Sequence, residues 1–194
     1  MRRLYDQKLT TTSGGNVSKR IDNVILITAS QTDKATIDES QIGIMTTTGK
    51  NLSENLNISM ESKMHQAIYS RRPDVFAIVH AHPVFATSYA IAGKEIKTNL
   101  AGEARAVLGI PVTAPYALMG TRDLADKVGD ACLKGNVVLM ENHGIITVGK
   151  NLLQAYDRME VIEAAAKMTF ITTLLGSSKE LTREELKAID KLFE

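Results

Sequence analysis

Three of the four histidines in this chain lie near the ends of expected β-strands. His80 and His82 end the apolar run VFAIVHAH, and Pro83 follows at once. Residues two apart on a strand face the same side, so both imidazoles project together. His143 follows a second apolar run, NVVLM. Three imidazoles with an open fourth position are typical of catalytic zinc sites, but the spacing alone is equally consistent with ordinary hydrogen-bonded histidines at strand ends.

Two other features carry chemistry only in combination with such a metal site. Glu61 lies at the start of a helical pattern, where a glutamate is also explained by its favourable interaction with the helix dipole. In the loop TTSGGNVS, Gly14 and Gly15 permit backbone N–H groups to converge on an anion, and Asn16 can add a donor. By itself this loop is interpreted as a turn.

Alternating strand and helix patterns define the elements that position these residues. Strands are expected at 23–30, 41–51 and 75–82, and as a hinged pair within 136–149, whereas TTSGGNVSKR is interpreted as the turn that leads into the first strand. Helices are expected at 59–72 with Ser59 as N-cap, at 83–93, 121–135 and 152–175, and after the capping box of Thr182 and Glu185. A short helix is expected within the loop 98–109, and 110–120 is expected to be extended. The apolar stripe of the long helix consists of Leu152, Ala155, Tyr156, Met159, Ile162, Ala166 and Phe170.

Length and composition favour one α/β domain that covers residues 1–194. The net charge of +1 and the absence of a basic run argue against a nucleic-acid or membrane partner. No apolar stretch approaches the roughly 18 residues of a membrane span, and MRRLYDQKL lacks a signal-peptide core, so we expect a cytoplasmic protein. The one cysteine, Cys132, is expected to be a buried small hydrophobic residue rather than a nucleophile.

Motifs along nearly the whole chain resemble the class II aldolase/adducin family, and most closely its L-fuculose-1-phosphate aldolases. The motifs are SGGNVSKR at 13–20, ILITAS at 25–30, SMESKMHQAIYSRRPDVFAIVHAHP at 59–83, APYALMGTRDLADKV at 114–128 and ENHGIITVGKNLLQAYDRMEVIEAAAK at 141–167. The resemblance implies a single layered domain with a central, mainly antiparallel sheet flanked by helices. It also implies a homo-oligomer, a tetramer with active sites at subunit interfaces. Members usually begin with a longer amphipathic helix, so the N-terminal helix here is expected to be short or missing.

The resemblance assigns roles to particular residues. His80, His82 and His143 match the positions of the family's zinc ligands, with Mn²⁺ or Co²⁺ as alternative metals. Glu61 matches the acid/base glutamate, which binds the metal in the substrate-free state. The residues that match the phosphate-binding positions are Gly15, Asn16, Ser30 and Ser59.

The chain departs from the family at several places near the expected substrate. Gln31 and Met60 replace a glycine and a hydroxyl residue, so the phosphate pocket loses one donor; Lys34 supplies compensating charge or is an exposed strand-end lysine. The loop TNLAGEARAV lacks the tyrosine used at the aldehyde end, and Glu103 is either its substitute or a surface salt-bridge residue.

Two other polar residues lie near the expected ligands. His65 is expected to be a structural hydrogen-bonder, because three histidines and a carboxylate already complete the ligand set. Glu141 is expected to orient a metal ligand or to pair with a lysine.

Taken with the resemblance, these residues predict a zinc-dependent aldolase that cleaves a ketose 1-phosphate, such as L-fuculose 1-phosphate, to dihydroxyacetone phosphate and a short aldehyde. The cation would stabilise the enediolate left by carbon–carbon cleavage, and Glu61 would move the proton. Within the same chemistry, the alternatives are an L-ribulose-5-phosphate 4-epimerase and a sugar-phosphate dehydratase. A non-catalytic module like the head of adducin is the alternative of another class.

Overall fold

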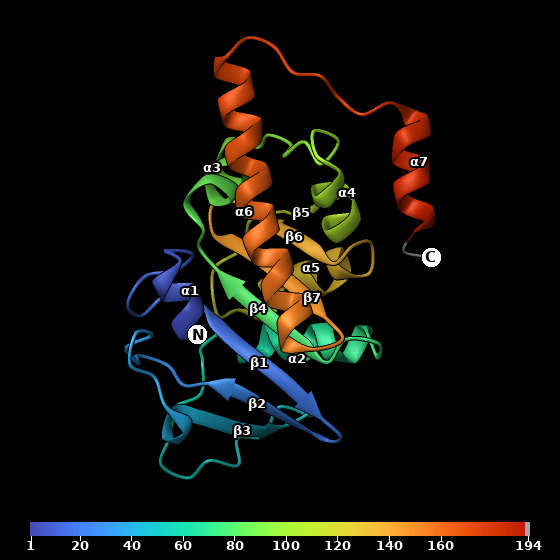
Figure 1. The fold of residues 1–194 in the computed structure, drawn as a ribbon. Coiled ribbons are helices and arrows are strands. Elements are labelled where there is room, and N and C mark those ends of the chain that lie inside the picture. The colour runs from blue at the N-terminus through green and yellow to red at the C-terminus, as the bar shows by residue number, and fades with distance from the viewer. Residues whose placement is uncertain (193–194) are drawn as a thin grey trace.

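Seven strands form one mixed sheet in the computed structural model, which describes residues 1–192 (Figure 1). The spatial order of the strands is β3-β2-β1-β4-β7-β6-β5. All neighbouring pairs are antiparallel except β5 with β6. The strands are β1 (Asn16–Ile21), β2 (Val24–Thr28), β3 (Ile42–Thr46), β4 (Ala77–Ala81), β5 (Val112–Ala114), β6 (Val137–Met140) and β7 (Gly144–Gly149). The prediction of one layered α/β domain with a mainly antiparallel sheet is confirmed.

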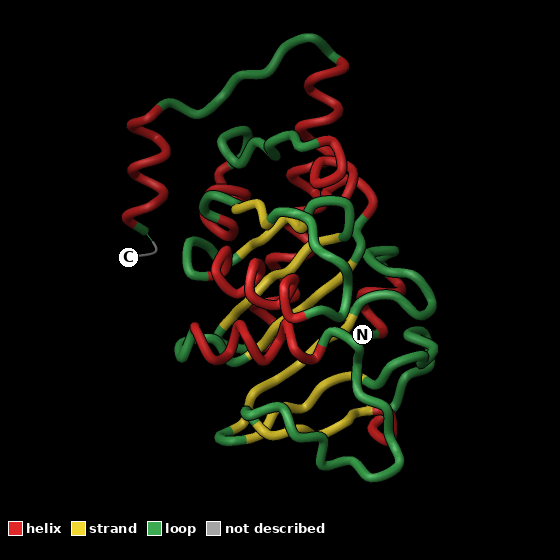
Figure 2. Tube along the Cα trace, turned by 180° about the vertical axis from the view of Figure 1, so that it is seen from behind, coloured by secondary structure: helices red, strands yellow, loops and turns green. Residues whose placement is uncertain are grey.

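Helices cover both faces of the sheet, as Figures 1 and 2 show from opposite sides. They are α1 (Arg2–Asp6), the 3-10 helix η1 (Glu39–Gln41), α2 (Ser62–Arg71), α3 (Val84–Ala92), α4 (Gly102–Leu108), α5 (Arg122–Cys132), α6 (Leu152–Leu174) and α7 (Arg183–Lys191). One core cluster joins the sheet to α3, α4 and α6, and the other joins it to α2 and α5. Strand β4 contributes Val79 to the first cluster and Ile78 to the second, as the alternation of side chains along a strand requires.

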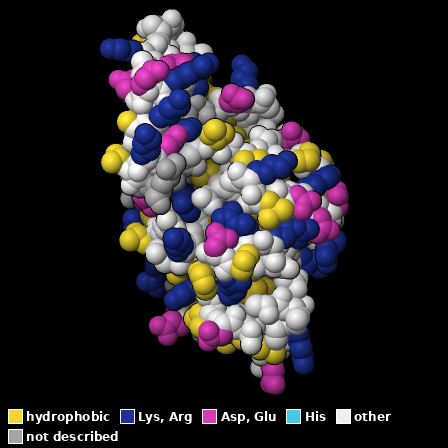
Figure 3. All heavy atoms as spheres, turned by 90° about the vertical axis from the view of Figure 1, so that its right-hand side faces the viewer, with side chains coloured by type: hydrophobic (Ala, Val, Ile, Leu, Met, Phe, Trp, Pro, Cys, Tyr) yellow, Lys and Arg dark blue, Asp and Glu magenta, His cyan; other side chains and the backbone are white. Residues whose placement is uncertain are grey.

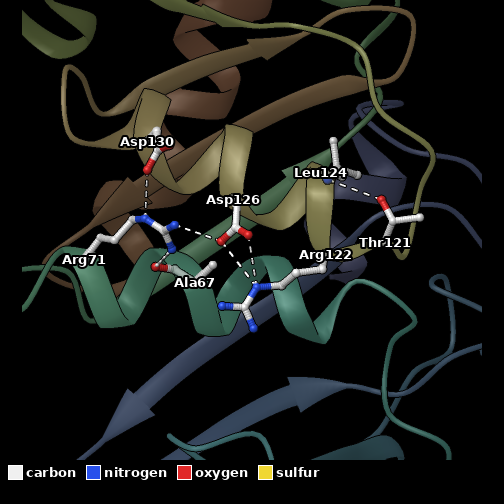
Figure 4. Close-up of polar contacts among 7 residues, drawn as sticks. All are labelled: Ala67, Arg71, Thr121, Arg122, Leu124, Asp126 and Asp130. Atoms are coloured by element: carbon white, nitrogen blue, oxygen red, sulfur yellow. Dashed lines mark hydrogen bonds and ion pairs between the residues drawn. The ribbon is translucent and has the colours of Figure 1, made fainter.

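The two helices on the second face are tied together by charge as well as by apolar packing (Figure 4). On α2, Arg71 donates to Asp126 of α5 at 2.8 Å and to Asp130 at 3.0 Å. Asp126 also accepts from Arg122, and the Thr121 hydroxyl caps the start of α5 by accepting from the Leu124 N–H. These contacts fix α2, the helix that begins just after Glu61, against the body of the domain.

The first strand of the sheet was not predicted. Residues 16–21 form β1, which lies between β2 and β4, although 16–20 were interpreted as part of a turn. Its inward face carries Asn16 and Ser18, both buried, rather than apolar side chains. Because a strand pattern is recognised by alternating hydrophobicity, a strand whose buried side chains are polar escapes it.

Most other elements follow the sequence patterns, although β3 ends at Thr46 rather than at residue 51 and α2 begins at Ser62 rather than at residue 59. Gly93 ends α3 in a left-handed conformation, the capping box of Thr182 and Glu185 opens α7, and Cys132 is fully buried, which raises the pKa of its thiol to about 12. The apolar stripe of α6 is correct in its middle but wrong at its ends. Leu152 and Phe170 are 41% and 44% exposed, and the far end of α6 extends past the strands in Figure 1.

The C-terminal helix stands apart from the sheet and is held by polar contacts (Figure 1). Arg105 of α4 makes two hydrogen bonds of 2.7 Å with Asp190, and Lys97 pairs with Glu180 ahead of α7. On the face shown in Figure 3, basic and acidic side chains are interspersed with scattered hydrophobic ones. Within residues 1–192, no helix is both long and apolar enough to cross a membrane.

Candidate metal centre

Three imidazoles converge at the centre of the sheet. His80 lies on β4, between β1 and β7, and is completely buried. His82 follows β4 directly, and His143 lies in the tight turn between β6 and β7. The prediction that His80 and His82 face the same side is confirmed, because their Nε2 atoms are 3.1 Å apart. One ring nitrogen from each of the three residues lies within 4.8 Å of the others.

The backbone of β7 fixes the protonation of His80. Its Nδ1 lies 3.0 Å from the carbonyl oxygen of Ile145, which can only accept a hydrogen bond. Nδ1 therefore carries the proton in neutral His80, and the lone pair of Nε2 faces His82. A backbone carbonyl that orients an imidazole in this way is the usual support of a metal-binding histidine.

Glu61 reaches the same point from the start of α2. Its Oε2 lies 3.1 Å from His80 Nε2, and its Oε1 lies 3.0 Å from His143 Nε2. The prediction that Ser59 caps this helix is wrong. The N-cap is Glu61, because residues 59–62 form a turn in which the Ser59 hydroxyl accepts from the Glu61 N–H at 3.2 Å. That turn places the carboxylate at the N-terminal end of α2, where it points toward the imidazoles.

The charges of this cluster are strongly coupled. Burial alone would raise the pKa of the Glu61 carboxyl, but His80 and His143 outweigh burial and lower that pKa well below its ordinary value. Burial alone would lower the pKa of His80, but the Glu61 carboxylate raises it. For His82, burial and the neighbouring imidazoles lower the pKa to about 3. Glu61 therefore stays ionised and favours a cation, a proton or a metal ion, at the ring nitrogens.

The donor set fits a four-coordinate metal ion. Ligand atoms 2.0–2.2 Å from a tetrahedral zinc lie about 3.3–3.6 Å from one another. Three of the contacts, His80–His82, His80–Glu61 and His143–Glu61, are 3.0–3.1 Å, and the three ring nitrogens lie within 4.8 Å of one another, so small shifts of the side chains would bring them to that separation. Within residues 1–192, Glu61 Oε1 is also one of the few buried side-chain oxygens with no hydrogen-bond donor. Three imidazole nitrogens and a carboxylate suit zinc and its neighbours in the transition series.

A directed chain of hydrogen bonds holds Glu61 from behind. Because a carboxylate only accepts, the Asn16 amide donates to Glu61 Oε2 at 2.8 Å, and the Asn16 carbonyl oxygen accepts from His65 Nε2 at 2.5 Å. His65 Nδ1 must then accept from the Ser18 hydroxyl at 2.6 Å, which leaves Ser18 to accept from the Tyr69 hydroxyl at 2.8 Å. Every proton in the chain is therefore placed.

The predicted structural role of His65 is confirmed by this chain. Burial and the positive charge of His80 lower the pKa of His65 to about 3, so its imidazole is neutral, as the chain requires. The sequence interpretation missed Ser18 and Tyr69. The signals were the spacing of Ser18 two residues after Asn16 on one strand, and of Tyr69 four residues after His65 on one helix.

A glycine leaves room for the His82 ring. A Cβ atom on Gly144 would lie 2.5 Å from His82 Cδ2 and 2.8 Å from the carbonyl oxygen of Ala81. We therefore expect Gly144→Ala to displace the imidazole and weaken metal binding by about 10- to 100-fold, measured with zinc as the probe in competition with a chromogenic chelator. Gly102→Ala is the matched control, because its Cβ would meet only Ile189 at 3.7 Å. Equal zinc affinity in Gly144→Ala and the wild-type protein would contradict this role.

A pocket of about 370 Å³ opens beside the cluster. Its walls include most of the residues predicted from the sequence, namely Gly15, Asn16, Ser30, Ser59, Glu61, His82 and His143, together with Met119 and Asn142. At Gly15, the left-handed backbone (φ +65°) and the closeness of the His80 carbonyl leave no space for a Cβ. The pocket thus places the candidate phosphate-binding residues next to the candidate metal ligands.

The structure also places three residues whose roles the sequence left open. Lys34 is not an exposed strand-end residue, since it is 1% exposed and lines the pocket. Glu141 accepts from the Tyr116 N–H at 3.1 Å and thereby holds the segment that follows β5, instead of pairing with a histidine or a lysine. Glu103 lies on the exposed side of α4 and is not among the residues that line the pocket of its own chain.

Comparison with known proteins relates this arrangement to enzymes that act on sugar phosphates. Residues 1–170 match the family described as Class II Aldolase and Adducin N-terminal domain. An L-fuculose phosphate aldolase from Methanococcus maripaludis is 33% identical, over 89% of this chain and 93% of its own. A 3-oxo-tetronate 4-phosphate decarboxylase from Haemophilus influenzae is 28% identical, over 97% and 91%. A solved L-fuculose 1-phosphate aldolase structure matches with a TM-score of 0.91 and 32% identity, over 99% of this chain and 91% of that one.

Proposed function

Because the chain belongs to the class II aldolase and adducin family, we propose that it is a zinc-dependent aldolase that cleaves a ketose 1-phosphate. The substrate class is represented by L-fuculose 1-phosphate, and the products are dihydroxyacetone phosphate and a short aldehyde. The observation that carries this proposal is the convergence of His80, His82, His143 and Glu61 within hydrogen-bonding distance. Manganese and cobalt suit the same ligands.

The reaction needs a sink for negative charge and a group that moves a proton. When the carbon–carbon bond beta to the ketone breaks, its electron pair passes to the carbon next to the carbonyl. His80, His82 and His143 would hold the zinc ion, which when bound would supply positive charge to stabilise a developing anion. In the synthetic direction the Glu61 carboxylate would remove a proton from that carbon. In the cleavage direction the substrate hydroxyl that becomes the aldehyde carbonyl would release a proton to a second base or to solvent, and Glu61, once protonated, would deliver a proton to the carbon.

The hydrogen-bond chain behind Glu61 prepares it for this role. The Asn16 amide holds Oε2, and it is itself held by His65, so the carboxylate keeps one orientation. A fixed carboxylate loses little orientational freedom when the substrate arrives, which is the advantage of a preorganised site. In this proposal the Asn16 side chain orients Glu61. Asn16 contributes to phosphate binding only through the backbone of the loop that also contains Gly15.

The phosphate group of the substrate is assigned to the hydroxyl and backbone groups that line the same pocket. Ser30 and Ser59 offer hydroxyl groups there, and the loop at Gly15 offers backbone N–H groups. Ser59 already receives the N–H of Glu61, so it links the two halves of the site. The absence of a hydroxyl at Met60 is compatible with this assignment if another donor takes its place.

A second acid/base group at the aldehyde end would come from another subunit. Glu103 is exposed and lies outside the pocket of its own chain, so it reaches a substrate only across an interface. We therefore include a homotetramer with active sites at subunit boundaries in the proposal. A shallow groove of about 740 Å³ over β1 and β2, lined by Val17, Leu26 and Ile42, offers apolar surface for such contacts. The protein is proposed to work in the cytoplasm.

A panel of phosphorylated substrates tests the proposal. Purified enzyme loaded with zinc is incubated with L-fuculose 1-phosphate, L-ribulose 5-phosphate and 3-oxo-tetronate 4-phosphate. We expect dihydroxyacetone phosphate, detected with a coupled dehydrogenase, from the first substrate. Cleavage of the second substrate could not produce it, because a ketose 5-phosphate carries its phosphate on the aldehyde fragment.

Other results of the same panel would indicate an alternative function. Conversion of L-ribulose 5-phosphate to xylulose 5-phosphate without cleavage would indicate the epimerase. Carbon dioxide release from the third substrate, without cleavage of the first, would indicate a decarboxylase like the relative from Haemophilus influenzae. Absence of any turnover despite bound zinc would favour a non-catalytic module.

A further inference from the structure

Lys34 is a buried cation that the reaction proposed above does not use. Its side chain is 1% exposed, and lysine is almost never fully buried without a partner charge. Lys34 lies between β2 and η1, and its backbone N–H donates to the carbonyl of Thr12 at 2.9 Å. That bond joins the segment that carries Lys34 to the loop that carries Gly14 and Gly15, and all three residues line the pocket.

The protein satisfies the hydrogen bonds of the Lys34 ammonium only in part and does not neutralise it. Nζ donates to Thr32 Oγ1 at 2.8 Å and to the Ala29 carbonyl at 3.3 Å, which occupies two of its three donors. None of the ion pairs among residues 1–192 includes Lys34. Burial lowers the pKa of the ammonium, and an incoming anion would offset that cost.

The surroundings of Lys34 favour a phosphate over other anions. Ser30 and Ser59 line the same pocket, so hydroxyl donors and a cation are available to one group with several acceptor oxygens. A phosphate monoester has three terminal oxygens that accept hydrogen bonds, whereas a carboxylate has two, so a phosphate can accept from the ammonium and from both hydroxyl groups at once.

We propose that Lys34 is a specificity-determining residue that binds the phosphate group of the substrate, in place of the hydroxyl donor that Met60 does not provide. The identity of the substrate rests on the proposed function, whereas the anion site rests on the burial and partners of Lys34. A bond from an ammonium to a phosphate is charge-assisted, and its loss is expected to weaken binding about 10- to 100-fold.

Titration of inorganic phosphate into the zinc-loaded protein tests the anion site without any turnover. Wild-type protein is compared by calorimetry with Lys34→Met and Lys34→Gln, and Lys50→Met is the matched control, since Lys50 is exposed and outside the pocket. We expect both Lys34 variants to lose about 10- to 100-fold in phosphate affinity and Lys50→Met to stay within twofold. The amide introduced by Lys34→Gln can still donate to Thr32 or Ala29. If Lys34 only held the loop in place through these hydrogen bonds, Lys34→Gln would therefore keep most of the phosphate affinity.

A kinetic arm then connects the anion site to the substrate. If L-fuculose 1-phosphate is cleaved, Lys34→Gln should raise its KM by a similar factor with kcat changed less than about threefold. Thermal melting and zinc content confirm that each variant is folded and loaded. Unchanged phosphate affinity in both variants, or no phosphate binding by wild-type protein, would overturn the inference. A wild-type protein that binds phosphate through Lys34 but cleaves no ketose phosphate would overturn the proposed function alone.

Discussion

Replacing His80 by alanine is expected to abolish both zinc binding and cleavage. His80 is completely buried, its Nδ1 is held by Ile145, and its Nε2 contacts both His82 and Glu61. Loss of one of three imidazoles leaves the metal with too few protein ligands, and the positive charge that stabilises the developing anion is worth several kcal/mol. We therefore expect kcat/KM to fall by at least about 10³-fold.

Zinc content distinguishes this effect from general damage to the fold. Metal analysis should give one zinc per wild-type chain and much less than one for His80→Ala. His65→Ala is the matched control: it removes a buried histidine of the same site that contacts Asn16 and Ser18 rather than the other imidazoles. It should keep its zinc while losing thermal stability, because two buried polar groups lose their partner. Full zinc content and activity in His80→Ala would contradict the assignment of the metal centre.

Chelation tests whether cleavage requires the metal, without any mutation. Removal of zinc from wild-type protein should abolish cleavage, and added zinc should restore it. In the metal-free protein, the Glu61 carboxylate raises the pKa of His80, so His80 tends to keep a proton on the nitrogen that would bind the metal. Metal must displace that proton, so we expect the site to refill more readily as the pH rises.

The shared face of His80 and His82 could be predicted from local geometry, whereas their assignment with His143 to one metal site came from the family resemblance. His80 and His82 share a face through the two-residue repeat of a strand, and His143 lies in a turn between two strongly apolar strands. The pairing of β4 with β7 then brings these residues together. The register of that pairing depends on long-range contacts, which no local pattern specifies.

The unpredicted parts of the site are those in which polar side chains are buried. Strand β1 was missed because Asn16 and Ser18 occupy positions where apolar residues are expected. The burial of Lys34 depends on a loop that folds back onto the carbonyl of Thr12, and loops carry no hydrophobic period from which to predict such a contact. Departures from the hydrophobic pattern thus concentrate at the candidate site, where polar groups must be held inside the protein.

Among the residues that contact the metal ligands, Glu61 is the one whose replacement should separate binding from chemistry. Glu61→Gln keeps the shape of the side chain but removes its ability to exchange a proton. The three imidazoles remain, so we expect zinc to stay bound. Loss of a positioned acid/base group typically costs about 10²- to 10⁴-fold in rate, and we expect kcat to fall by that amount with little change in KM.

A proton-exchange measurement shows the lost step directly. In deuterated water, wild-type enzyme should exchange one carbon-bound hydrogen of dihydroxyacetone phosphate without any aldehyde present, and Glu61→Gln should not. Glu141→Gln is the matched control, because Glu141 lies two residues before His143 but accepts only from the Tyr116 N–H. Exchange at the wild-type rate in Glu61→Gln would assign the proton transfer to another group, whereas loss of exchange with zinc retained would place it on Glu61.

Since the Asn16 amide fixes Oε2, Asn16→Ala should show the same exchange defect to a smaller degree, in proportion to the orientation that the carboxylate loses.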